Sequence, residues 1–126
     1  MRAVDTNVLI RLIVGDDAKQ AAAAERFIGQ GAWVSHLVLA ETAWVLSAVY
    51  GLSAARLAAA IDALLSHKDL TIQDAETVAL ALGSFRTRPT LGFSDCLVLE
   101  IARKAGHIPF GTFDRGQARL DGTQRL

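Results

Sequence analysis

The chain has 126 residues, enough for one compact domain whose hydrophobic core needs no disulfide or structural zinc. Its 13 Lys and Arg balance 13 Asp and Glu, so the net charge alone does not point to a nucleic-acid-binding protein. No apolar run of about 20 residues and no basic-then-apolar leader occurs, which predicts a cytoplasmic protein without a membrane segment. The single cysteine, Cys96, cannot form an internal disulfide and is expected to lie in the core.

Apolar periodicity and capping residues predict short strands that alternate with helices. Strands are expected just before Asp5 and over residues 32–35, 70–72 and 108–113. Helices are expected over residues 6–13, 18–30, 36–50, 54–65, 74–85 and 95–104, with a short terminal helix from Asp114 and no pattern beyond Asp121. Because no hairpin signal separates the strands, we predict one α/β domain over residues 1–126, with three layers and a short central parallel β-sheet flanked by helices.

Glu41 is the only Asp, Glu, Lys or Arg between Phe27 and Ala55. At 100° per residue, its helical neighbours include Leu37, Val38 and Trp44, and a helix that is apolar nearly all round is typical of a buried one. We therefore expect the carboxylate to face inward, where burial without a partner would cost several kcal/mol. A salt bridge to a distant arginine is one explanation, and a metal or catalytic role is the one we favour.

Three further acids stand at the starts of predicted helices. Asp95 follows Ser94, the expected N-cap, and it shares a helical arc with Val98 and Leu99, so it is also expected to face inward. Asp5 and Asp114 each follow a strand, where either could act simply as an N-cap.

Asp5, Glu41, Asp95 and Asp114 stand where a parallel α/β fold would bring side chains together. Four carboxylates cannot lie that close without a large rise in pKa or a bound cation. Hard oxygen ligands of this kind suit Mg²⁺ or Mn²⁺. The sequence thus predicts one acidic metal site built by all four residues.

The same residues carry a resemblance to a known family. The segments 5–7 (Asp-Thr-Asn), 93–95 (Phe-Ser-Asp) and 112–114 (Thr-Phe-Asp), together with Glu41, are similar in order and spacing to the PIN domain, specifically to VapC-type toxins of bacterial toxin-antitoxin pairs. The resemblance covers nearly the whole chain. It implies a Mg²⁺- or Mn²⁺-dependent endoribonuclease that hydrolyses RNA phosphodiester bonds.

The resemblance also implies roles for individual residues and for partners. The metal ligands and catalytic residues would be Asp5, Glu41, Asp95 and Asp114, and the supporting residues Thr6, Asn7, Ser94 and Thr112. A homodimer and a VapB-like antitoxin, whose tail fills the groove beside the site, would be the protein partners. A hydrophobic fraction of 52%, slightly above the ~45–50% of soluble domains, agrees with a covered surface.

Basic residues near the acids are the candidates for RNA contacts. Arg11, Arg86, Arg88 and Arg115 are considered, and Arg86 and Arg88 are favoured because they lie in the loop before Ser94 and Asp95. Two other interpretations stay open: a housekeeping PIN nuclease in RNA processing or DNA cleavage, and a catalytically silent PIN-like module that binds a protein partner.

Overall fold

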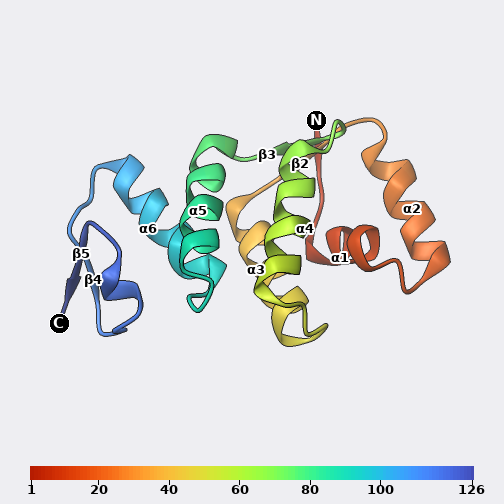
Figure 1. The fold of residues 1–126 in the computed structure, drawn as a ribbon. Coiled ribbons are helices and arrows are strands. Elements are labelled where there is room, and N and C mark those ends of the chain that lie inside the picture. The colour runs from red at the N-terminus through yellow and green to blue at the C-terminus, as the bar shows by residue number, and fades with distance from the viewer. The chain divides into compact units, whose positions relative to one another are not determined.

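The computed structural model describes residues 1–126, which fold into two compact units, Met1–Ala75 and Glu76–Leu126. The first contains three strands, β1 (Arg2–Ala3), β2 (Ala32–Val34) and β3 (Leu70–Ile72), and four helices, α1 (Thr6–Val14), α2 (Ala18–Ile28), α3 (His36–Ala48) and α4 (Ala54–Ser66). The second contains α5 (Ala75–Thr87), which begins at the boundary, α6 (Phe93–Ala105), β4 (Phe110–Thr112), the 3-10 helix η1 (Gln117–Arg119) and β5 (Thr123–Arg125). Figure 1 labels most of these elements and colours them in chain order, from red at the N-terminus to blue at the C-terminus.

The first unit is organised by a parallel sheet in the order β1-β2-β3. Ala3 pairs with Trp33, and Trp33 pairs in turn with Thr71, so all three strands end at the same edge. The helices pack against one another as the pairs α1–α2, α1–α3 and α3–α4, and α3 and α4 run side by side in Figure 1. The predicted α/β fold with a short parallel sheet flanked by helices is confirmed.

Local chemistry explains where the helices of the first unit begin and end. The side chains of Asp5, Asp17, Ser35 and Ser53 each accept a backbone N–H of the first helical turn, as N-caps do. Gly15 ends α1 in the left-handed conformation, at φ 67°. The core contains fully buried residues from several elements, among them Leu9, Ile28, Val34, Leu39, Leu46 and Ile61.

The second unit differs from the prediction at its C-terminal end. The strand expected over residues 108–113 is shorter, and it pairs in parallel with β5 in a separate two-stranded sheet rather than joining β1-β2-β3. The expected terminal helix is a single 3-10 turn, and β5 lies where no pattern was recognised. Phe85 and Phe93 meet edge to face in the core, with ring centroids 6.1 Å apart.

No helix in this structure is long and apolar enough to cross a membrane.

Candidate functional site

Asp5 lies two residues beyond the end of β1 and caps α1, as the sequence predicted. Its Oδ1 accepts a hydrogen bond from the backbone N–H of Val8 at 3.2 Å, and the side chain is exposed. Thr6 is buried and Asn7 is exposed. Because the cap uses only Oδ1, Oδ2 has no donor within this unit and is open to a ligand.

Glu41 is exposed, so the inward orientation expected from the sequence is wrong. The buried residues of α3 are Leu39, Thr42, Ala43 and Leu46, on an arc roughly opposite Glu41. Leu37 and Trp44 flank the carboxylate and are 78% and 63% exposed, so the helix is not buried all round either. Glu41 forms no hydrogen bond or salt bridge within its unit. No arginine of residues 1–75 therefore pairs with it, as one explanation from the sequence required.

The sheet brings Asp5 and the start of α3 to one edge. β1 and β2 are parallel neighbours, Asp5 follows the end of β1, and Ser35 joins the end of β2 directly to α3. α1 and α3 also pack against each other. Asp5 and the helix of Glu41 thus share the carboxyl edge of the sheet, where parallel α/β folds bind ligands.

Asp95 and Asp114 are linked in the second unit by Gln117. Its buried side chain donates from Nε2 to the Asp95 carbonyl oxygen at 3.1 Å, and its backbone N–H donates to Asp114 Oδ1 at 2.9 Å. Its Oε1 accepts a hydrogen bond from the Thr112 hydroxyl at 2.9 Å. Gln117 therefore fixes the backbone of one acid and the carboxylate of the other. A single glutamine in a stretch without periodicity gave no sign of this role.

Thr112 supports Asp114 directly, since its buried hydroxyl accepts the Asp114 backbone N–H at 3.0 Å. Gly116 lies close by, where an added Cβ would be 2.7 Å from Leu91 Cδ2 and 3.2 Å from Asp114 Oδ1. The turn that carries Asp114 is therefore held by Thr112 and Gln117, and a side chain at Gly116 would require Leu91 to shift.

The start of α6 differs from the predicted one. The helix begins at Phe93 with Gly92 as N-cap, so Ser94 is a half-buried residue of the first turn rather than the cap. Asp95 is half-buried, and its Oδ2 accepts the Gly92 N–H at 3.3 Å in a capping-box arrangement. Asp95 was expected to face inward, but it is only half-buried, and its Oδ2 contacts the backbone of Gly92 just before the helix.

Each of the four acids has the chemistry of a divalent-metal ligand. In Asp5, Asp95 and Asp114 one oxygen accepts a backbone N–H and the other has no donor within its unit, while both oxygens of Glu41 are open. Hard, unpaired carboxylate oxygens fit Mg²⁺ or Mn²⁺. Within either unit, no three His, Cys, Asp or Glu side chains lie close enough to hold a metal ion. The four acids are divided in pairs between the units, and their convergence on one ion stays a prediction.

The arginines considered for RNA contacts have different surroundings. Arg11 is engaged in a network: it forms a 2.8 Å ion pair with Asp16 and donates to Gln20 and Tyr50. It is therefore a poor candidate for binding phosphate. Arg86, Arg88 and Arg115 are all exposed.

Cys96, beside Asp95, is buried as predicted. Burial raises the pKa of its thiol to about 11, with smaller contributions from the carboxylates of Asp95 and Glu100. A thiol of this kind stays protonated near neutral pH and does not act as a nucleophile.

A comparison with protein families identifies the chain. Residues 2–123 match the model of the PIN domain, and the match runs through both units and all four acids. The chain belongs to the PIN-domain family. No curated protein and no solved structure matches it. PIN membership implies a nuclease-type function, and PIN domains typically use divalent metal ions. The predicted family and the coarse activity are therefore confirmed.

Proposed function

We propose that this PIN domain is a Mg²⁺- or Mn²⁺-dependent endoribonuclease, with Asp5, Glu41, Asp95 and Asp114 as its metal ligands. The observation that carries the proposal is that all four acids lie within the family match and keep at least one carboxylate oxygen without a donor in their unit. An ion held there would supply charge stabilisation for the scissile phosphate and a more acidic water molecule.

The chain's own residues would orient these ligands. The backbone N–H groups of Val8, Gly92 and Gln117 each donate to one oxygen of an aspartate and leave the other oxygen without a donor in its unit. Thr112 fixes the backbone of Asp114, and we assign Thr6, Asn7 and Ser94 a supporting role beside the acids that they adjoin. Ligands held in this way lose little conformational freedom when they bind an ion.

We further propose that the protein is the toxin of a VapBC-type pair and forms a homodimer. The exposed apolar side chains of Leu37 and Trp44 flank Glu41, which supports a protein partner that covers this face. An antitoxin bound there would lie beside a metal ligand and would hinder RNA from reaching it.

The enzymatic proposal is tested by substitution of each ligand with its amide. An asparagine at positions 5, 95 and 114 retains an oxygen that can accept the capping N–H, and Glu41→Gln changes only an exposed side chain, so the fold should persist. Purified protein is incubated with single-stranded RNA and Mn²⁺. We expect cleavage by the parent and by Glu25→Gln, an exposed control on α2, and loss of cleavage in Asp5→Asn and Asp95→Asn. If these two amide variants cut RNA as fast as the parent, the proposal is wrong.

The partner proposal needs a separate test. Expression of the chain alone should arrest growth, and Asp5→Asn should relieve the arrest. Co-expression with a small DNA-binding protein encoded beside it should also relieve it, and Trp44→Lys in the toxin should weaken that protection without reducing RNA cleavage. Cleavage without growth arrest would favour a housekeeping nuclease, and neither cleavage nor metal binding would favour a silent binding module.

A further inference from the structure

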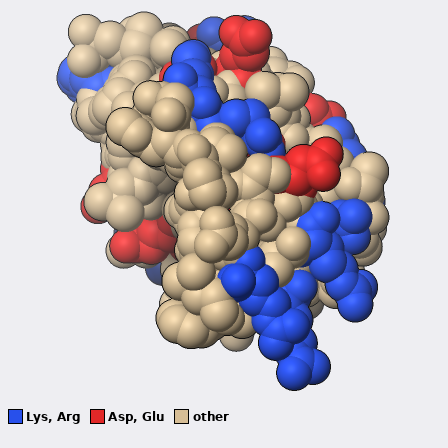
Figure 2. Space-filling model, turned by 90° about the vertical axis from the view of Figure 1, so that its left-hand side faces the viewer, with Lys and Arg blue, Asp and Glu red and all other residues tan.

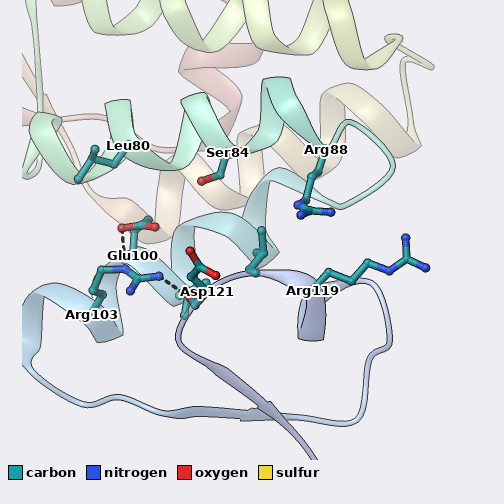
Figure 3. A pocket seen from close by; sticks show the side chains of 9 residues that line it. Leu80, Ser84, Arg88, Glu100, Arg103, Arg119 and Asp121 are labelled. Carbon is teal, nitrogen blue, oxygen red and sulfur yellow. Dashed lines mark hydrogen bonds and ion pairs between the residues drawn. The ribbon is translucent and has the colours of Figure 1, made fainter.

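The second unit contains a cavity of about 460 Å³ between α5, α6 and the segment around Leu120. Leu80 and Leu120 give it an apolar floor, to which Leu99 adds little because it is 2% exposed. Ser84 and Asp121 contribute polar groups that point into it in Figure 3. None of the four proposed metal ligands lines this cavity. Its size and mixed lining suit a small organic ligand with both an apolar and a charged part.

One wall of the cavity is held in place by Arg103. Its guanidinium pairs with Glu100 at 3.4 Å and donates to the Asp121 carbonyl oxygen at 2.5 Å. An added Cβ at Gly122 would lie 3.0 Å from Arg103 Nη1, so the guanidinium packs tightly on this turn. Arg103 therefore neutralises Glu100 and fixes the segment that carries Arg119 and Asp121.

The other end of the cavity carries two arginines that are not engaged in this way. Arg88 and Arg119 are exposed and form no side-chain hydrogen bond or ion pair within the unit, and in Figure 3 they lie at the end opposite Glu100 and Arg103. Exposed guanidinium groups without a carboxylate partner are the groups that bind phosphate.

The charge of the surrounding unit favours an anion as well. Residues 76–126 contain seven Lys and Arg against five Asp and Glu, whereas residues 1–75 contain six against eight. All seven basic side chains are exposed, and Figure 2 shows several groups of Lys and Arg on one face, with Asp and Glu beside some of them. The neutral net charge of the whole chain thus hides a unit with two more basic than acidic residues, a balance that favours an anion over a cation.

We propose that this cavity is a nucleotide subsite for single-stranded RNA, with one phosphate bound by Arg88 and Arg119. The base would lie on Leu80 and Leu120, and Ser84 and Asp121 would hydrogen-bond to the ribose or to the base edge. The inference rests on the proposed ribonuclease function and adds a place where the substrate is held apart from the acids.

Binding of RNA without cleavage tests this subsite. A short fluorescein-labelled single-stranded RNA is titrated with protein in EDTA, and binding is followed by fluorescence anisotropy at several salt concentrations. Arg88→Gln and Arg119→Gln are compared with Arg125→Gln, which removes the same charge from exposed β5 outside the cavity. All three should fold, which thermal melting checks.

We expect each cavity variant to bind RNA about tenfold more weakly. Its log–log salt slope should fall by at most roughly 0.7, the value for one lost phosphate contact on a single strand, because the other arginine still contacts the phosphate. Arg125→Gln should change neither quantity. If all three variants lose RNA affinity equally, the loss reflects the net charge of the protein and the subsite is wrong. The subsite is also wrong if the parent does not bind the RNA.

Competition identifies the ligand class. Adenosine monophosphate should displace the RNA at a concentration about tenfold lower than inorganic phosphate does, because only the nucleotide covers the leucine floor. Equal potency would overturn the nucleotide assignment. The subsite and the metal site can fail independently. If the parent cleaves RNA but all three arginine variants bind RNA equally well, only the subsite is wrong. If the cavity variants bind RNA weakly but Asp95→Asn still cleaves it, only the proposed metal site is wrong.

Discussion

Gln117→Leu tests whether the hydrogen bonds that join Asp95 to Asp114 stabilise the second unit. Leucine has a similar volume, but it removes the acceptor for the Thr112 hydroxyl and the donor to the Asp95 carbonyl. The backbone N–H of residue 117 can still donate to Asp114 Oδ1. The substitution therefore removes two hydrogen bonds and leaves the buried Thr112 hydroxyl without an acceptor.

The expected cost follows from these two bonds. Each contributes about 0.5–1.5 kcal/mol net, so the free energy of unfolding should fall by about 1–3 kcal/mol. For a chain of this length, 1 kcal/mol corresponds to a decrease in Tm of roughly 3–5 °C. The measurement is urea unfolding followed by circular dichroism, supported by thermal melting.

The matched control is Gln124→Leu, the same chemical change at an exposed position of β5. It should alter the free energy of unfolding by less than about 0.5 kcal/mol. If Gln117→Leu is no less stable than Gln124→Leu, the buried bridge does not stabilise the fold, and its assigned role is refuted.

Two further predictions concern residues near the same turn. Gly116→Ala should destabilise the protein by about 1 kcal/mol or more, because the added Cβ meets Leu91. Gly83→Ala, which has open space on helix α5, should be neutral or stabilise the protein by about 0.5–1 kcal/mol. Urea unfolding of both variants measures this difference. Because the pKa of Cys96 is raised to about 11 in the folded state, the unfolded chain loses this proton first as the pH rises, and stability should fall between pH 9.0 and about 11. Cys96→Ala should lose less stability than the parent over this range, and an equal loss in both would contradict the assignment.

The elements that the sequence predicted well have strong local signals. The strands predicted over residues 32–35 and 70–72 are found over 32–34 and 70–72, and Asp5 and Ser53 are caps as predicted. These signals are reliable because apolar patterns and side-chain capping act over a few residues. β5 was missed because Thr123–Arg125 has no apolar pattern, and its pairing with β4 depends on the chain around it.

The orientation of Glu41 could not be obtained in this way. α3 is apolar on almost every side, so periodicity does not distinguish the arc of Leu39 and Leu46, which is buried, from that of Leu37 and Trp44, which is exposed. The chemical identity of the four acids was visible in the sequence. The hydrogen bonds that orient them depend on tertiary neighbours such as Gln117, which one sequence does not reveal.

The most direct test of the central claim is calorimetric titration with Mn²⁺ of the parent and of Asp5→Asn, Glu41→Gln, Asp95→Asn and Asp114→Asn. A shared site built by both pairs of acids predicts that the tightest binding event of the parent is lost or strongly weakened in each of the four variants, while Glu25→Gln retains it. Retention of that event in Asp5→Asn together with its loss in Asp95→Asn would show that the acids of the two units do not hold the same ion.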